Sequence, residues 1–288
     1  MNLRVWLTLL AAALPAALAA ADPAAWRVQG KSGGELTLLG SMHVLRPSDY
    51  PLPPTVNALI DGADNIVMEI DLDDVDGAQQ QLIVQKAMLP QGKVLADVID
   101  ADAYRLVTQH MSALGVDVKA LEHFEPWFLA LTVLDIGMRK LGFQPDRGVE
   151  QYVLARARGA GKEIVGLETL EFQIGLFDAL PPEQQQAMLE QTLDEIDEGA
   201  EVLSKMVAAW RAGELESLSS ELLEDFGDFP GLYEKLVTDR NNAWVPKLER
   251  LLTDGQHHLV VVGALHLVGP DNVIDLLKKR GHEIERLH

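Results

Sequence analysis

The chain of 288 residues contains no cysteine. Disulfide bonds, thiolate zinc sites and a cysteine nucleophile are therefore excluded, and so is a lipid anchor on an N-terminal cysteine. Positive charge is also scarce, because 24 lysines and arginines stand against 44 acidic residues, a formal net charge of −20. Such a balance disfavours phosphate backbones and anionic lipid headgroups. We therefore expect neither nucleic acid nor an anionic membrane surface as a partner.

Long apolar runs are absent except at the start of the chain. Met1–Arg4 is short and positively charged, Val5–Leu18 is largely apolar, and Ala17-Leu18-Ala19 offers a small-X-small cleavage site. This pattern predicts a secretory signal peptide, and the apolar stretch is short for a membrane span. We expect residues 1–21 to be removed and residues 22–288 to act in the periplasm or outside the cell, without stable membrane insertion. If cleavage fails, the same segment anchors the protein on that side.

Common catalytic and nucleotide-binding motifs are missing as well. The chain has no Gly-X-Ser-X-Gly nucleophile elbow. Gly30-Lys31-Ser32 does not end a phosphate loop, because Ala25 stands where that motif needs its first glycine. His282-Glu283 does not begin a zinc-protease motif, because Arg286 stands where the second histidine would be.

What the chain has instead is a motif that occurs twice, once near each end. Leu38–Pro47 and Val261–Pro270 each contain an aliphatic run, a glycine, two residues, a histidine and two more aliphatic residues before an X-Pro pair. An apolar run bounded by glycine and proline predicts a buried strand followed by a turn. Because α/β sheets place their ligand sites at strand ends, His43 and His266 are expected to face one site. They would bind one metal ion, or act as base and acid.

Further candidate site residues are three glutamates, an arginine and an asparagine that lie on or next to other predicted strands and helices. Glu69 ends an apolar strand, so it needs a cation, hydrogen-bond donors or a raised pKa. It is either a catalytic or metal-binding residue, or a strand-end acid satisfied by backbone or an arginine. Glu168 follows a short strand and Glu150 lies on the preceding helix, and each is open between a site role and a structural role. Arg240 and Asn241 could hold a carboxylate or a developing oxyanion, or lie on a helix surface.

The apolar patterns place strands at the two ends of the chain and around Val165, with helices between them. An opening hairpin is predicted over residues 26–39, and a strand, a helix and a strand are predicted over residues 259–287. We therefore expect an α/β fold: a single domain with a central mixed sheet completed by both termini and a large helical middle.

Eight short strings lie in a fixed order along nearly all of the chain after residue 21. They are Gly40-Ser41-Met42-His43, Met68-Glu69-Ile70-Asp71, Gly148-Val149-Glu150-Gln151-Tyr152, Gly161-Lys162, Gly166-Leu167-Glu168-Thr169, Trp210-Arg211-Ala212-Gly213, Asp239-Arg240-Asn241 and Gly263-Ala264-Leu265-His266-Leu267. In order and spacing they resemble the TraB/GumN family, which is similar to the TIKI metalloproteases and, more remotely, to the erythromycin esterases. Glu150 stands where many relatives carry aspartate, and His282 stands where the final strand often begins with tyrosine.

The resemblance implies a shared α/β core in which the two Gly-X-X-His motifs and the strand-end glutamate converge. It maps the metal ligands of the family's site onto His43, Glu69 and His266, with Arg240 and Asn241 as neighbours. It also implies Mn²⁺ or Co²⁺ rather than Zn²⁺, as in TIKI-like proteases.

The leading hypothesis is thus an exported, metal-dependent hydrolase that acts on peptides, in which the bound ion lowers the pKa of a water molecule. Glu168 or Glu150 would carry the proton, and Arg240 with Asn241 would stabilise the tetrahedral intermediate. One alternative is a metal-independent, esterase-like hydrolase of small-molecule esters, with a histidine as the base. The other is a non-catalytic protein that binds or sequesters a peptide, since TraB-like relatives are linked to the shutdown of peptide pheromones.

Overall fold

The computed structural model describes residues 22–71, 77–196, 199–224, 226 and 230–287. The signal peptide predicted over residues 1–21 lies outside this part of the chain. Among the residues that the structure describes, no helix combines the length and the apolar character needed to cross a membrane.

Within the described residues, a six-stranded sheet has the strand order β4-β3-β5-β2-β1-β6. The strands are β1 (Ala25–Gln29), β2 (Glu35–Ser41), β3 (Asn65–Ile70), β4 (Ile164–Glu168), β5 (His257–Gly263) and β6 (Ile284–Leu287). Strand β1 is antiparallel to both β2 and β6, whereas β2, β5, β3 and β4 pair in parallel. The predicted mixed sheet completed by both ends of the chain is therefore confirmed. Strand β6 joins the sheet beside β1, so the last strand–helix–strand segment does not pair its own two strands.

Helices occupy most of the chain between β3 and β5. The α-helices are α1 (Pro54–Gly62), α2 (Gly77–Lys86), α3 (Ala101–Leu114), α4 (Pro126–Lys140), α5 (Val149–Gly159), α6 (Leu170–Asp178), α7 (Pro182–Glu195), α8 (Gly199–Ala212), α9 (Leu215–Glu224), α10 (Pro230–Tyr233), α11 (Asp239–Leu251) and α12 (Val273–Lys279). The sequence patterns did not predict α6. It begins directly after β4 because the Thr169 side chain accepts a hydrogen bond from the Phe172 N–H at 3.2 Å and so caps the first turn.

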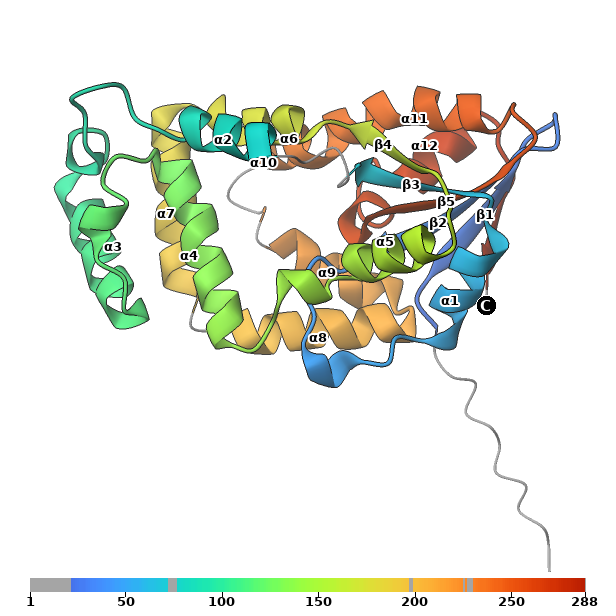
Figure 1. Cartoon of the computed structure of the whole chain (residues 1–288), viewed down its shortest axis with the longest axis horizontal. Helices are drawn as coiled ribbons and strands as arrows, with labels where there is room; N and C mark the ends of the chain where they lie inside the picture. The colour runs from blue at the N-terminus through green and yellow to red at the C-terminus, as the bar shows by residue number, and fades with distance from the viewer. Residues whose placement is uncertain (1–21, 72–76, 197–198, 225, 227–229, 288) are drawn as a thin grey trace, which may run out of the picture.

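The sheet is covered by helices on both faces (Figure 1). One face packs against α1, α5 and α8, with Ile60, Val153 and Trp210 buried beside strand residues such as Met68. The other face packs against α11 and α12, where Trp244 is almost completely buried. Burying a large apolar side chain contributes roughly 1.5–3 kcal/mol, so these two layers hold the sheet.

The helical middle has a core of its own, away from the sheet (Figure 1). Helices α3, α4 and α7 meet there around buried side chains such as Met111 and Leu129. Leu189 and Leu193 of α7 are fully buried, and Ile196 is 8% exposed, as their helical spacing predicts.

The pairing register of β2 and β5 brings the two repeated motifs side by side. Gly40 lies opposite Val262 and Ser41 lies opposite Gly263 in this parallel pair. A Cβ atom at Gly40 would lie 3.1 Å from the Ala264 Cα, a tight contact, so a glycine here lets the second motif approach closely. Both motifs therefore leave the sheet at the same edge.

Candidate active site

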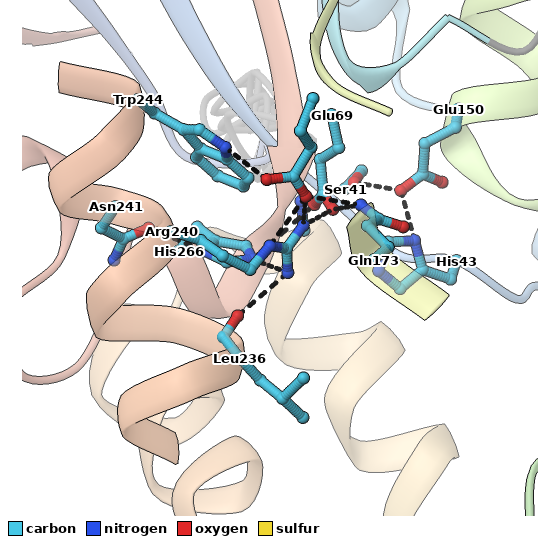
Figure 2. A network of polar contacts seen from close by, with 12 residues as sticks. Ser41, His43, Glu69, Glu150, Gln173, Leu236, Arg240, Asn241, Trp244 and His266 are labelled. Atoms are coloured by element: carbon cyan, nitrogen blue, oxygen red, sulfur yellow. Dashed lines mark hydrogen bonds and ion pairs between the residues drawn. The ribbon is translucent and has the colours of Figure 1, made fainter. Parts of the chain in front are cut away.

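The candidate active site lies at the carboxyl ends of the four parallel strands (Figure 2). His43 follows β2, Glu69 lies near the end of β3, and Glu168 is the last residue of β4. His266 ends the short 3₁₀ helix η7 (Ala264–His266), which follows β5 directly. Because parallel strands end at one edge of a sheet, residues that are far apart in the sequence meet here.

Gly263 is the point around which the three expected metal ligands gather. Its N–H donates to Glu69 Oε1 at 2.7 Å. A Cβ atom at this position would lie 3.1 Å from His43 Nε2 and 3.2 Å from Glu69 Oε1. His266 Nε2 is 3.8 Å from the same Glu69 oxygen. The structure thus brings His43, Glu69 and His266 together, and the missing side chain of Gly263 makes room for them.

Arg240, on α11, is inserted among these groups and is only 9% exposed. Its Nη2 lies 2.5 Å from Glu69 Oε2 and 2.5 Å from Glu168 Oε1, and its Nε donates to the same Glu168 oxygen at 2.8 Å. Its Nη1 lies 2.9 Å from the Leu236 carbonyl oxygen and 3.1 Å from His266 Nε2. A guanidinium has five N–H donors, and all five have an acceptor inside the protein.

Two further residues, for which the sequence predicted no role, complete this cluster. Gln173 Nε2, on α6, donates to Glu69 at 3.0 Å and to Glu168 at 2.8 Å. Trp244 Nε1 donates to Glu168 Oε2 at 2.9 Å, and the Arg240 Cζ lies 4.8 Å from the centre of the Trp244 ring. Trp244 follows Arg240 by four residues, a spacing that places both on one face of a helix and could have revealed it. No comparable signal marks Gln173, because α6 itself was not predicted.

Asn241 fixes the orientation and the tautomer of His266. Asn241 Nδ2 donates to the Asp271 carbonyl at 2.9 Å, so Oδ1 faces His266 Nδ1 at 2.7 Å and accepts its hydrogen. His266 Nε2 is then the acceptor for Arg240. Burial lowers the pKa of His266 to about 3, so the ring is neutral at neutral pH. Asn241 is 0% exposed and both its polar atoms are engaged, so its position fits the orientation of His266 rather than contact with a substrate oxyanion.

His43 pairs with Glu150 on the other side of Gly263. His43 Nδ1 lies 2.6 Å from Glu150 Oε1, and the Ser41 hydroxyl donates to the same oxygen. The negative charge of Glu150 raises the pKa of His43 to about 9. Burial raises the pKa of Glu150, but the charge of His43 and the hydrogen bonds from His43 and Ser41 together lower it below its usual value. The His43 side chain is 67% exposed and that of Glu150 is 16% exposed, so water reaches the imidazole of this pair.

Both strand-end glutamates are bound by their neighbours, and those around Glu69 hold it as an anion. Burial raises the pKa of Glu69, but His266, Arg240 and His43 together lower it to about 2. Since His266 is neutral above a pH of about 3, Arg240 and His43 supply the positive charge at neutral pH. Glu168 is 6% exposed, and its two oxygens accept from Arg240, Gln173 and Trp244. Its position therefore fits the anchoring of Arg240 better than proton transfer to a substrate.

The described residues do not fit the metal site that the resemblance implies. Among them, no group of three or more histidine, aspartate or glutamate side chains is arranged to hold an ion. The cause is Arg240, because its guanidinium lies between Glu69 and His266 and binds the nitrogen that would face the metal. Glu69, His43 and His266 meet as expected, but Glu69 and His266 bind a guanidinium and His43 pairs with Glu150.

Comparisons with known proteins cover nearly the whole of this architecture. YbaP of Escherichia coli (strain K12), described as an uncharacterized protein, is 27% identical over 241 residues, which cover 84% of this chain and 87% of that protein. An uncharacterized protein of Treponema pallidum (strain Nichols) is 21% identical over 283 residues, which cover 93% of this chain and 84% of that protein.

A more distant relative carries a functional description. The metalloprotease TIKI homolog of Amphimedon queenslandica is 21% identical over 314 residues, which cover 91% of this chain and 61% of that protein. No solved structure matches the chain significantly. The sequence profile of the TraB/PrgY/gumN family matches residues 24–286, from the first strand to the last, and the chain therefore belongs to that family.

Proposed function

We propose that the protein is a hydrolase of peptide or small-ester bonds in which His43 activates the attacking water. The observation that carries this proposal is the His43–Glu150 pair. A carboxylate on Nδ1 fixes the ring and leaves Nε2 free to take a proton, which is the arrangement of a general base. Nε2 also lies next to Glu69 and the Gly263 backbone, at the centre of the site.

The proposed reaction needs only protons, water and the scissile bond. Neutral His43 takes a proton from water at Nε2 while the water oxygen bonds to the carbonyl carbon. Glu150 stabilises the imidazolium that forms, as in other carboxylate–histidine pairs. The tetrahedral intermediate then collapses, the C–N or C–O bond breaks, and the imidazolium returns the proton to the leaving amine or alkoxide.

Arg240 would act in this reaction through its charge. Each of its N–H groups already has an acceptor in the protein, so the expected direct hydrogen bond to an oxyanion would require one of them to be released. A fixed positive charge in a largely buried position still stabilises negative charge that develops nearby. Glu69 and Glu168 hold the guanidinium in that position.

Membership of the TraB/PrgY/gumN family and the likeness to a protein named metalloprotease support the hydrolase class. The name of that relative also favours a second candidate, a metal-dependent peptidase that uses Mn²⁺ or Co²⁺. In this chain the ion would have to displace Arg240 from Glu69 and His266. The predicted signal peptide supports action in the periplasm or outside the cell.

The test measures turnover of a quenched-fluorescence peptide library and of nitrophenyl esters by purified residues 22–288, with EDTA, Mn²⁺ or Co²⁺. We expect cleavage in EDTA and a loss of about 10²- to 10⁴-fold in the His43→Gln variant. His123→Gln is the matched control, because His123 is an exposed histidine outside the site that contacts Glu122 and the Lys93 backbone.

The other outcomes each select an alternative. Cleavage that appears only with Mn²⁺ or Co²⁺ would establish the metal-dependent peptidase and refute the metal-independent reaction. Peptides that bind stoichiometrically and are recovered uncut under every condition would establish the sequestering protein instead.

A further inference from the structure

The guanidinium of Arg240 is surrounded by the donor types that bind first-row divalent cations. Carboxylate oxygens of Glu69 and Glu168 lie 2.5 Å from Nη2, and the imidazole nitrogen of His266 lies 3.1 Å from Nη1. Carboxylate oxygen and imidazole nitrogen are the ligands that suit Mn²⁺ and Co²⁺. The space between these donors, where an ion would bind, is filled by the guanidinium.

The groups behind these donors are arranged as they are around bound metals. His266 donates its Nδ1 hydrogen to Asn241, which aims Nε2 at the centre of the cluster. The amide of Gln173 donates to both carboxylates, and Trp244 donates to the far oxygen of Glu168. Hydrogen bonds of this kind orient ligands and are as characteristic of a metal site as the ligands themselves.

Arg240 is held in place from every side. The aromatic face of Trp244 stacks near its Cζ, and the Leu236 carbonyl accepts from Nη1. Leu236 belongs to a π-helical turn, η6 (Glu234–Thr238), that leads directly into α11. Such turns are rare and occur mostly at functional sites. A backbone acceptor aimed at the guanidinium shows that this position is built for an arginine.

We propose that Arg240 is the cation of this site, standing where a divalent ion would otherwise bind, and that removing its guanidinium opens a divalent-cation site formed by Glu69, Glu168 and His266. The inference concerns binding and does not depend on the proposed hydrolysis. Turnover tests the first proposal and Co²⁺ affinity tests this one, so their failures can be told apart.

The experiment titrates Co²⁺ and Mn²⁺ into residues 22–288 of the wild type and of Arg240→Ala, with Co²⁺ absorption and calorimetry as readouts. The variant is expected to bind one Co²⁺ at least about tenfold more tightly than the wild type, because the repulsion of a buried positive charge is gone. Adding His266→Ala to the variant should abolish the gain. Methylguanidinium, a free analogue of the lost side chain, should compete with Co²⁺ in the single variant.

Arg139→Ala is the matched control, because Arg139 is a half-exposed arginine whose ion pair with Asp135 lies on the surface of α4. It should bind Co²⁺ no better than the wild type. A folded Arg240→Ala protein that binds Co²⁺ no more tightly than the wild type would overturn the proposal.

If Arg240→Ala does not fold, Co²⁺ binding to the wild type and refolding of the variant with Co²⁺ test the proposal instead. One tightly bound Co²⁺ in the wild type, lost in Glu69→Gln, would show that the ion and Arg240 coexist or that the ion displaces it, and the proposal fails. Recovery of a folded Arg240→Ala protein only when Co²⁺ is present would support it.

Discussion

The two histidines of the repeated motif have opposite charge states. Glu150 stabilises the imidazolium of His43 and raises its pKa to about 9, whereas burial lowers the pKa of His266 to about 3. The difference arises from their partners: His43 faces a carboxylate and water, while His266 lies between Asn241 and the cationic Arg240. At neutral pH His43 therefore carries a proton that it loses only toward pH 9, whereas His266 is neutral and accepts a hydrogen bond.

The charge state of His43 predicts the pH dependence of hydrolysis. Only the neutral ring acts as a base, so kcat/KM should rise with pH and level off above about 9. The measurement is the pH–rate profile of the wild type, together with that of Glu150→Gln. Removing the carboxylate should move the midpoint toward the ordinary histidine value of about 6.5. A rate that falls through pH 9 would instead make His43 the acid.

Glu69→Gln should destabilise the protein at neutral pH by about 1–3 kcal/mol, because a buried arginine loses one of its two carboxylate partners. The lowered pKa of Glu69, about 2, means that the folded state favours the carboxylate. This contribution is present above the unfolded value of 4.5 and is lost as pH falls through about 2. Urea denaturation at pH 7 and pH 3 measures it.

The control is Glu201→Gln, which removes an exposed carboxylate that pairs with Lys205 on α8, and which should change the stability by less than about 0.5 kcal/mol. Equal stability of Glu69→Gln and the wild type at neutral pH would show that Arg240 does not depend on Glu69.

The positions of most site residues could be predicted from the sequence, but their hydrogen-bond and ion-pair partners could not. The aliphatic runs, glycines and strand-end acids gave the positions of His43, Glu69 and His266. The sequence could not show that Arg240 would bind Glu69, Glu168 and His266, because these acceptors come from β3, β4 and η7, which are distant in the chain. Asn241 was expected at an oxyanion for the same reason, since only the fold reveals that Asp271 and His266 occupy its side chain.

At the scale of elements, helix α5 positions Glu150 beside His43. The helix begins after Gly148, and the Val149 N–H donates to the Met42 carbonyl at 2.9 Å. A Cβ atom at Gly148 would overlap with the His43 carbonyl oxygen. The first turn of α5 is therefore in direct backbone contact with the first Gly-X-X-His motif.

Gly148→Ala should push α5 away from this motif. We expect a loss of about 1–3 kcal/mol in the free energy of unfolding, as for overpacking in a core. We also expect a fall in the midpoint of the pH–rate profile, because Glu150 moves with the helix. Gly159→Ala lies at the other end of α5, where the new Cβ meets no described atom within 4 Å beyond its chain neighbours and its own helix backbone, so it should leave both quantities near the wild type. Identical effects of the two substitutions would contradict this account.

The elements themselves were largely predictable, with one informative exception. Strands β1, β2, β3 and β5 are short apolar runs bounded by turn residues, and α4 and α7 begin at prolines. Helix α6 has no such signal, because it follows β4 after a single capping residue, Thr169. It supplies Gln173 to the site, so missing the helix also meant missing this contact.

For the whole molecule, export is the prediction that the sequence makes most directly. The basic start, apolar stretch and small-residue cleavage site predict a mature N-terminus near Ala20 or Asp22. N-terminal sequencing of protein from the periplasmic fraction measures it. Recovery of the intact chain from the cytosol alone would refute export.

The sheet pairs early segments of the chain with segments that are synthesised much later. Strand β1 pairs with β6, and β2 pairs with β5, so these contacts join residues more than 200 positions apart. Contacts of such long range form late and slowly, because a long loop must close first. While the ribosome is still making β5, the chain has His43 but neither Gly263 nor His266 beside it. A chain that stops before β5 therefore lacks Gly263 and His266 and contains no assembled site, so the chemistry of the site becomes possible only after η7 has been made.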